Sequence, residues 1–578
     1  MKDFFKKFFY ILGESKKKVF LISLLFLFIA GLDFIGIGLF IPLVSILLFP
    51  EKIQDQFFYR VINGKFQIEI ETFSLLLCVV ILLIFFLRNF LYIFSNAYIF
   101  RFGFSQMARL REKLLDSYMK LPYIWHLKQN SSRIIQNISG ETSQFCNNVL
   151  LPFLRLFGQC IILLFLLFLL LRENPLFTLL LILILSTVFC FFSFLTRKVS
   201  SRLGETVSVS SEAIIKNIRQ GIGSIKDAKI TAKEDFFREN IHKEANKFAT
   251  ASSKYQIISF SPTSIIELAI ITYIISWLLV YSILGKDIQS LIPLLTIVTL
   301  AGLRILPLIS QMMQTVNSFN SANYFMGKLY HDLASLEQTG KDVVSRKIKK
   351  FKKIEIKNLS FKYDEEYILK NVNMVIKRND IIGITGETGS GKTTFINILL
   401  GLLKNDGGKI KVDGKIYPNK YLRHLMAYIP QDIFLLDDTI ERNIAFGVKD
   451  EDVDKIKVIE SLKAAQVYDF VEKLSDKLDT IIGENGIRLS GGQRQRLGIA
   501  RALYHDRKIF VFDEATSSLD YKTESKVQEA IMSLKDKKTI IMIAHRLRTL
   551  KECDKVYVLD KGKIVKRGKY KEIRDYLK

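Results

Sequence analysis

Long apolar runs fill the first 335 residues of the chain, whereas residues 354–578 have the mixed composition of a soluble α/β domain. Six of these runs are long enough to cross about 30 Å of hydrocarbon as helices. We therefore expect an α-helical transmembrane domain with six spans over residues 1–335. The predicted spans lie near residues 19–49, 73–100, 148–171, 175–196, 256–284 and 291–316.

The charges of the segments that join these runs predict their orientation. Segment 50–72 carries three basic residues against four acidic ones, and segments 172–174 and 285–290 are short. Segment 101–147 carries seven basic residues, and segment 197–255 is long and basic. Because cytoplasmic segments of membrane proteins are enriched in Lys and Arg, we expect the two long segments and both termini in the cytoplasm.

Two further segments are expected at the membrane surface. The first residues, MKDFFKKFFYILGESKKK, are basic and aromatic and contain no small-residue cleavage site. They predict an amphipathic helix on the membrane rather than a signal peptide. The outer segment from Ile53 to Ile70 contains an apolar cluster between residues 57 and 62, which predicts a short interfacial helix that contacts a lipid tail.

The overall composition excludes some classes of protein. The net charge is +26, and a basic protein can bind nucleic acid, but the 49% hydrophobic content favours a membrane protein with positive cytoplasmic parts and no nucleic-acid partner. The lysine-rich segment 336–353 is interpreted as a solvated linker, with a contact to nucleic acid or lipid as the alternative. The five cysteines form no C-x-x-C pair, so they predict neither a metal site nor a disulfide framework.

A phosphate-binding loop follows the linker. Residues 386–393, GETGSGKT, match the pattern G-x-x-x-x-G-K-[ST] between a strand-like segment at 381–384 and a helical segment at 394–400. The glycines allow backbone N–H groups to approach phosphates, Lys392 reaches the β- and γ-phosphates, and Thr393 offers its hydroxyl to Mg²⁺. The residues of this loop that we expect to contact a nucleotide are Gly386, Thr388, Gly389, Ser390, Gly391, Lys392, Thr393 and Thr394.

A pair of acidic residues follows a second buried strand. The apolar run 509–512 predicts a parallel strand that presents Asp513 and Glu514 at its carboxyl end, where open α/β sheets place ligands. One carboxylate at such a position holds Mg²⁺, and the second orients or deprotonates a water molecule. The two motifs together predict an enzyme that hydrolyses a nucleoside triphosphate.

Further motifs in fixed order identify the family that the chain resembles. The soluble half resembles the ATP-binding domain of an ABC transporter, and a chance set of solvated loops does not explain the complete order. Its motifs are the phosphate loop at 386–393, Gln431 in YIPQD, LSGGQ at 489–493, IFVFDE at 509–514, SSLD at 517–520 and His545.

The resemblance implies a role for each of these residues. Glu514 is the expected general base, His545 contacts the γ-phosphate, and Gln431 senses the metal and links hydrolysis to the membrane half. Thr393, Gln431 and Asp513 are the implied contacts of Mg²⁺. Tyr363, in FKY, takes the place of an aromatic that stacks on adenine.

The resemblance also implies a dimer. In this family the LSGGQ loop of one ATPase domain closes over the nucleotide bound by the other, so one chain with one copy of each motif predicts an isologous homodimer. Ser490 and Gly492 then donate hydrogen bonds to the γ-phosphate of the partner's nucleotide, and Glu484 couples to the partner's docking helices. The resemblance also implies that Gly491, Gln493 and Asp520 belong to the nucleotide-binding residues.

The layout resembles that of exporters in this family: a transmembrane domain (1–335), a linker (336–353) and an α/β P-loop NTPase domain of ABC type (354–578). It implies that the two long cytoplasmic segments are helical extensions of the spans. Each is expected to end in a short helix that docks on an ATPase domain, within about 120–140 and 205–225.

Ionisable residues within the apolar runs bear on the substrate. Each of Asp33, Arg88, Arg155, Glu267 and Arg304 costs about 2.5–3.5 kcal/mol at mid-helix on insertion scales. One interpretation is structural, with Asp33 or Glu267 paired to an arginine, and Arg88 and Arg155 reaching to the interface. The other is a positive cavity that receives a phosphate or pyrophosphate headgroup.

Four stretches of the membrane half resemble bacterial lipid-linked oligosaccharide flippases, although the further basic residues of that group near Thr263 and Gln311 are missing. These stretches are GLDFIGIGLFIP (31–42), FFLRNFLYIFSNAYIFRF (85–102), KQNSSRIIQNISGET (128–142) and LRILP (303–307). The candidate substrate residues are Arg88, Arg304, Glu267 and Asp33.

The sequence thus predicts a homodimeric exporter in the bacterial cytoplasmic membrane that uses ATP and Mg²⁺. Its expected partners are an identical subunit, membrane lipid and an anionic lipid-linked substrate, best a polyprenyl-pyrophosphate-linked oligosaccharide or related glycolipid. The alternative is a multidrug or lipid A-type exporter. A soluble ABC ATPase of DNA repair or translation does not fit six membrane-length runs, and no protease domain for peptide export precedes the first span.

Overall fold

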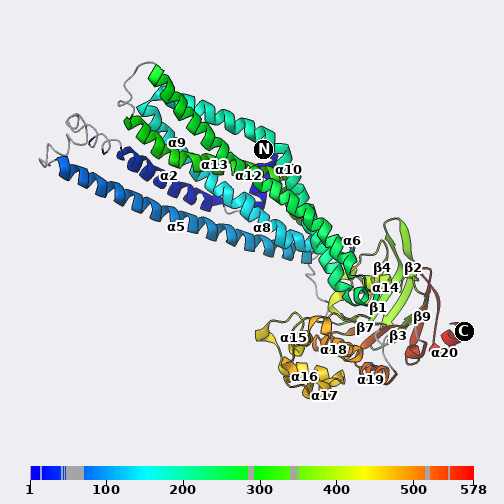
Figure 1. Ribbon diagram of the computed structural model, residues 1–578. Coiled ribbons are helices and arrows are strands. Elements are labelled where there is room, and N and C mark those ends of the chain that lie inside the picture. The colour runs from blue at the N-terminus through cyan, green and yellow to red at the C-terminus, as the bar shows by residue number, and fades with distance from the viewer. Residues whose placement is uncertain are drawn as a thin grey trace. The chain divides into compact units, whose positions relative to one another are not determined.

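The computed structural model describes most of the chain in two compact units (Figure 1). The first unit comprises Met1–Leu121 and Gln129–Lys341, and the second comprises Pro122–Lys128 and Asp342–Lys578. The boundary at Lys341 falls inside the segment that the sequence assigns to a linker. The described residues are 2–13, 16–40, 43, 46, 70–283, 292–338, 348, 350–514, 521–544 and 547–577.

The first unit is built from long helices that lie roughly side by side (Figure 1). Two short π-helical stretches, η2 and η3, interrupt the helical path between α7 and α9. The helices are α1 (Lys2–Leu12), α2 (Lys16–Gly38), α5 (Ile70–Met119), α7 (Ser131–Ile135), η2 (Gln136–Glu141), α8 (Thr142–Phe145), η3 (Cys146–Leu150), α9 (Leu151–Glu173), α10 (Pro175–Gly223), α11 (Ile225–Thr231), α12 (Glu234–Ile283) and α13 (Ile292–Gln338).

Several of these helices are much longer than a membrane is thick. At a rise of 1.5 Å per residue, the 50 residues of α5 or α12 extend about 75 Å, against about 30 Å of hydrocarbon. The implied helical extensions of the spans are therefore confirmed. Within the described residues, four helical segments, 71–119, 131–172, 175–223 and 234–283, are long and apolar enough to cross a membrane. The count of six spans stays a prediction.

Small side chains set the spacing of the helices in this unit. A Cβ on Gly204 of α10 would lie 2.1 Å from the backbone oxygen of Ser321 in α13, so only glycine permits this approach. The turn at which the chain reverses direction between α9 and α10 also depends on a few adjacent residues. Asn174 accepts a hydrogen bond from the backbone N–H of Phe177 (3.1 Å) and caps α10, with Pro175 at its first position.

The amphipathic N-terminal helix forms as α1, and part of its apolar face packs against the helices of the first unit. Phe8 is 1% exposed and packs on Phe153 of α9, with ring centroids 4.6 Å apart. Phe4 packs on Phe319 of α13 at 5.2 Å. Phe9 is 41% exposed, so the bundle covers only part of the apolar face, and the position of this helix at the membrane surface stays a prediction. The interfacial helix expected at 53–70 lies almost wholly outside the described residues.

One docking helix is found where it was expected, and the other is displaced. The short helix α6 (Tyr123–Lys128) belongs to the second unit, where Tyr123 and Ile124 pack against the apolar core. The second short helix was expected within 205–225, but α10 continues unbroken to Gly223 and the short helix is α11, which follows it. That position was wrong because the chain has no helix-breaking pair before Gly223 and Ser224.

The second unit contains two sheets and surrounding helices, which confirms the α/β class. The six-stranded sheet has the order β10-β9-β3-β8-β7-β6, and the four-stranded sheet has the order β2-β1-β4-β5. The strands are β1 (Lys353–Tyr363), β2 (Glu366–Lys377), β3 (Ile381–Thr385), β4 (Gly407–Val412), β5 (Lys415–Ile416), β6 (Met426–Ile429), β7 (Ile509–Asp513), β8 (Thr539–Ile543), β9 (Lys555–Asp560) and β10 (Lys563–Gly568). The helices are α14 (Lys392–Leu399), η5 (Asn419–His424), α15 (Ile440–Ile444), η6 (Asp450–Asp452), α16 (Lys455–Ala464), α17 (Tyr468–Glu472), η7 (Lys477–Asp479), η8 (Glu484–Gly486), α18 (Gly491–Tyr504), α19 (Tyr521–Met532), η9 (Leu547–Leu550) and α20 (Tyr570–Leu577).

Parallel pairing in the larger sheet brings distant segments together. β3 pairs with β8 and β9, β7 pairs with β6 and β8, and all of these pairs are parallel. Every residue of β3, β7 and β8 is buried, as expected for strands covered on both faces. The carboxyl ends of β3, β6 and β7 therefore lie at one edge of the sheet, the usual place of a ligand.

A buried polar network ties the chain after β6 to helix α18. Asn443 is fully buried, and its side chain bonds to the backbone N–H (2.9 Å) and carbonyl (3.0 Å) of Leu436. Arg501 of α18 donates to the carbonyl and side-chain oxygens of Asn443 (2.8 and 3.0 Å) and to the carbonyl of Phe434 (2.9 Å). Burial lowers the pKa of Arg501 to about 10. This segment and α18 are therefore held as one body.

Replacement of Asn443 by alanine tests this network. Asn443→Ala leaves buried polar groups without partners, at a cost of about 1–3 kcal/mol, which lowers the unfolding midpoint by about 2–4 °C per kcal/mol for a domain of this size. Calorimetry of the detergent-solubilised protein measures the midpoint. Asn373→Ala is the control, because its side chain also bonds to the backbone but is exposed: it accepts from the N–H of Asn358 (2.9 Å) and donates to the carbonyl of Asn371 (2.9 Å). Equal midpoints for the two variants would contradict the account.

Candidate functional site

The phosphate loop connects β3 to α14 in a conformation that requires glycine. Gly386 has φ 152°, and a Cβ there would lie 2.0 Å from the carbonyl oxygen of Leu559. Gly391 has φ 100° and forms the N-cap of α14. Gly389 has φ 85° and no neighbouring atom near the place of a Cβ, while the Ser390 N–H donates to the carbonyl of Glu387 (3.1 Å). The loop thus curves in front of a helix N-terminus, a favourable place for phosphate.

The ammonium group of Lys392 lies at the centre of this loop. Lys392 is 6% exposed, and its Nζ donates to the carbonyls of Gly386 (2.9 Å) and Glu387 (2.7 Å). Burial lowers the pKa of Lys392, while the nearby carboxylates of Glu514 and Asp513 act to raise it. The structure therefore brings together the predicted lysine and the two predicted acids, although about 120 residues separate them in the chain.

The two acids have different surroundings. Asp513 is 9% exposed, and it accepts a hydrogen bond from the hydroxyl of Tyr428 on β6 (3.0 Å). Burial and the Asp513 carboxylate raise the pKa of Tyr428, which keeps this phenol a neutral donor. Glu514 is less buried and has φ 49°, an unusual conformation outside glycine, and its N–H donates to the carbonyl of Ile543 (3.1 Å). The turn at Glu514 separates its side chain from the strand.

The side chains at this edge fit a magnesium ion. The hydroxyl of Thr393 and the carboxylate of Asp513 are oxygen ligands, which Mg²⁺ prefers together with phosphate oxygens and water. Within the described part of the chain, no cluster of three or more His, Cys, Asp or Glu forms a separate metal site. Gln431, the third predicted contact, follows β6, and its carbonyl accepts a hydrogen bond from Nε2 of Gln495 (2.8 Å).

The LSGGQ segment begins helix α18 with a capping box. The Ser490 hydroxyl accepts from the N–H of Gln493 (3.3 Å), and the Gln493 side chain accepts from the N–H of Ser490 (2.8 Å). Gly491 and Gly492 form the first turn. Ser490 is exposed, so the N-terminus of α18, a favourable place for an anion, begins at the surface of this unit.

The remaining predicted residues lie on the phosphate loop or its helix, elsewhere in the second unit, or outside the described residues. Tyr363 ends β1 and packs edge-on against Phe361, with ring centroids 4.9 Å apart. Glu484 is exposed in η8, close to Ile487, which is 79% exposed. Thr388 is exposed and Thr394 is half-buried in α14. Asp520 and His545 lie outside the described residues.

In the first unit, two of the charged candidates pair with each other. Arg88 of α5 contacts Asp33 of α2 through two atoms, Nε at 2.9 Å and Nη2 at 3.0 Å from the carboxylate oxygens, and the side chains are 8% and 0% exposed. The structural interpretation holds for this pair. The alternative that Arg88 reaches the interface is wrong, because its head group is buried and paired. Glu267 is exposed on α12, and it forms no ion pair among the described residues.

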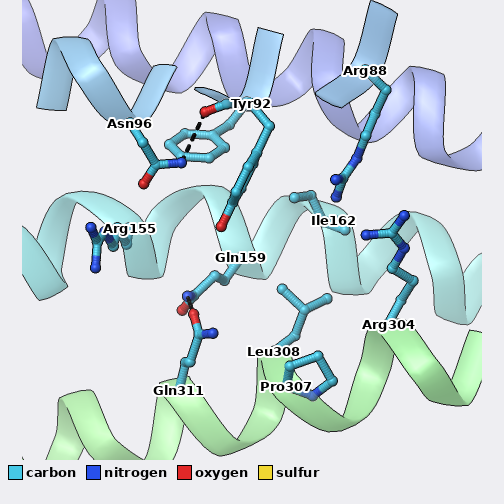
Figure 2. Close-up of a pocket in the computed structure, with 11 residues that line it drawn as sticks. Arg88, Tyr92, Asn96, Arg155, Gln159, Ile162, Arg304, Pro307, Leu308 and Gln311 are labelled. Carbon is cyan, nitrogen blue, oxygen red and sulfur yellow. Dashed lines mark hydrogen bonds between the residues drawn. The ribbon is translucent and has the colours of Figure 1, made fainter. Parts of the chain in front are cut away.

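A cavity with three arginines lies beside this pair (Figure 2). Its volume is about 150 Å³. The guanidinium of Arg155 lies 4.8 Å from the ring centre of Phe100, and that of Arg304 lies 5.8 Å from the ring centre of Phe85. No carboxylate is among the lining residues, which are Phe26, Arg88, Tyr92, Asn96, Arg155, Gln159, Ile162, Arg304, Pro307, Leu308 and Gln311.

Several lining residues were not predicted from the sequence. Tyr92 and Asn96 follow Arg88 by four and eight residues, so all three share one face of α5, and this spacing was available in the sequence. Gln159 follows Arg155 by four residues on α9 in the same way. The meeting of α5, α9 and α13 around one space carries no sequence signal.

Part of the chain is similar in sequence to known proteins. An "ATP-dependent lipid A-core flippase" of Francisella novicida is 44% identical over 223 residues, which are 38% of this chain and 37% of the relative. A protein of the same description from Ralstonia nicotianae is 40% identical over 228 residues, 38% of each chain. The match thus spans little more than a third of the length of these curated relatives.

A solved structure described as a bacterial Atm1-family ABC exporter with ATP bound shares the fold of nearly the whole chain. It aligns with 97% of this chain and 96% of that chain at a TM-score of 0.77 and 20% sequence identity. Residues 20–306 match the family described as the ABC transporter transmembrane region, and residues 369–517 match the family described as ABC transporter. The chain therefore belongs to the ABC transporter family, with an N-terminal transmembrane domain fused to an ATPase domain.

Proposed function

We propose that this protein is an ATP-driven exporter that flips a phosphate-bearing glycolipid, of the lipid A type, across the bacterial cytoplasmic membrane. The observation that carries the proposal is the cavity of the first unit, with Arg88, Arg155 and Arg304 in its wall. Among the described residues, Asp33 is the one carboxylate that pairs with any of them. Guanidinium groups bind phosphate well, because the planar cation directs two parallel N–H donors at two oxygens of the anion.

Two arguments favour the lipid A type over the polyprenyl-pyrophosphate oligosaccharide expected from the sequence. The similar proteins of Francisella and Ralstonia are described as lipid A-core flippases. The arginines are also spread along the cavity, whereas a pyrophosphate is a single compact anion. The polyprenyl-linked substrate remains the second candidate on the strength of the four resembling stretches, and both substrates carry a phosphate beside a glycan.

The proposed reaction uses the residues around Lys392 in a homodimer. Lys392 and the N–H groups of the phosphate loop neutralise the phosphates, and Glu514 accepts the proton of the attacking water. Thr393 and Asp513 would hold Mg²⁺, which would supply positive charge next to the phosphate oxygens. Ser490 of each chain is proposed to contact the nucleotide of the other, with His545 and Asp520 in the roles that the resemblance implies.

Replacement of Glu514 tests the catalytic assignment. Glu514→Gln keeps the size of the side chain but removes the base, so turnover of ATP falls about 10²–10⁴-fold with unchanged nucleotide affinity. Phosphate release and nucleotide-binding isotherms of the purified protein measure the two quantities. Glu460→Gln, on the exposed side of α16, is the control and retains activity. Hydrolysis by Glu514→Gln at the wild-type rate would remove Glu514 from this role.

Replacement of Arg304 tests the role of the cavity. Loss of one charge-assisted contact to phosphate, about 1.5–3 kcal/mol, reduces ATP-driven movement of a fluorescent lipid A analogue in proteoliposomes by about tenfold to a hundredfold. Basal ATP hydrolysis remains within about twofold, because Arg304 does not touch the nucleotide site. Arg172→Ala, at the end of α9 and outside the cavity lining, is the matched control. A parallel loss of hydrolysis and movement would identify Arg304 as a structural residue instead.

A further inference from the structure

The arginine cavity continues into a second, larger compartment of different chemistry. This compartment has a volume of about 410 Å³ and shares Tyr92, Asn96, Arg155, Gln159 and Gln311 with the first. The residues that it adds are Pro152, Gln314, Thr315 and Ser318. Its lining thus consists mainly of amide and hydroxyl side chains, and Arg155 is its one charged member. We call it the amide compartment.

A pair of glutamines forms the junction between the two compartments (Figure 2). Nε2 of Gln159 on α9 donates to Oε1 of Gln311 on α13 at 2.5 Å. Gln159 is 8% exposed, and its own Oε1 is buried without a hydrogen-bond partner among the described residues. An amide has two donors and one acceptor with two lone pairs, so the pair leaves an acceptor and donors for a ligand. A buried acceptor of this kind normally has a partner.

Two residues of α5 complete the wall opposite the glutamines. The Asn96 amide donates to the carbonyl of Tyr92 (2.9 Å), which fixes the amide and leaves its oxygen for another donor. The guanidinium of Arg88 lies 5.0 Å from the ring centre of Tyr92, and the Tyr92 hydroxyl is directed toward Gln159 in Figure 2. The wall therefore combines a fixed aromatic ring with neutral groups that both donate and accept.

This combination excludes some ligands and suits one class. An acyl chain would bury these amides without hydrogen bonds, which is unfavourable. A second phosphate can reach Arg155 where the two compartments meet, but the rest of this lining is neutral. Sugar hydroxyls both donate and accept, as the amides do, and a pyranose ring presents an apolar face to an aromatic side chain. We propose that the amide compartment is the subsite for the glycan of the transported lipid, with Gln159 and Gln311 as its specificity-determining residues.

The spacing along the helices gives the order of the two subsites. Gln311 follows Arg304 by seven residues of α13, a rise of about 10 Å. A phosphate at Arg304 thus places the attached sugar near the glutamine pair, and further sugars toward Ser318. This inference rests on the proposed function, because it assigns the glycan of the same lipid whose phosphate the arginines bind.

The experiment compares two lipids and one double variant. ATP hydrolysis by the reconstituted protein is titrated with a phosphorylated disaccharide lipid and with phosphatidic acid, which has a phosphate but no glycan. For the wild-type protein we expect half-maximal stimulation at about tenfold lower concentration of the disaccharide lipid, the ratio for one or two hydrogen bonds. Gln159→Leu combined with Gln311→Leu abolishes this difference and leaves the response to phosphatidic acid unchanged.

Controls separate the possible outcomes. Gln256→Leu removes an exposed amide of α12 outside the compartment and retains the tenfold ratio. If the double variant does not fold, the single variant Gln311→Met replaces it, because this side chain is exposed. We expect Gln311→Met to reduce the tenfold ratio between the two lipids. An unchanged ratio in a folded variant, or an equal loss of response to both lipids, overturns the glycan subsite. A wild-type protein that responds to neither lipid overturns the proposed function itself.

Discussion

The ammonium group of Lys392 lies where the buried strands β3 and β7, which both pair with β8, end at one edge of the sheet. Its neighbours are two backbone carbonyls and the carboxylates of Asp513 and Glu514. A buried cation is tolerated only where such partners surround it. The parallel pairing that places these strands together is therefore the constraint on which the candidate nucleotide site depends. Residues far apart in the chain act together because their strands have a fixed register.

The same physical rule, applied in the first unit, separates structural charges from charges available to a ligand. Arg88 and Asp33 satisfy each other across α5 and α2. Arg155 and Arg304 lie over aromatic rings and form no ion pair among the described residues. A cation that faces a cavity without a counter-charge favours an anionic occupant, because the occupant supplies the missing charge. This difference among three arginines directs the proposal toward a phosphate-bearing lipid.

Much of the fold was predictable because local signals carry it. The phosphate loop, the two acids at the end of β7 and the LSGGQ segment at the start of α18 each depend on a few adjacent residues. The structure has all three at the expected positions. The second docking helix was misplaced, since α10 continues through a polar stretch that gives no local stop signal before Gly223. Other contacts depend on helix packing, which brings together residues that are far apart in the chain. Examples are the packing of Phe153 on Phe8, the ion pair of Arg88 with Asp33 and the hydrogen bond between Gln159 and Gln311. Periodicity alone does not determine such pairs.

The central claim is that the arginine cavity binds the phosphate of a glycolipid. Native mass spectrometry of the intact wild-type protein, released from detergent with equal amounts of one glycolipid in its phosphorylated and dephosphorylated forms, tests this claim directly. The account predicts that the phosphorylated lipid remains bound as the dominant adduct and that the dephosphorylated lipid is largely lost. Equal retention of the two forms would contradict it.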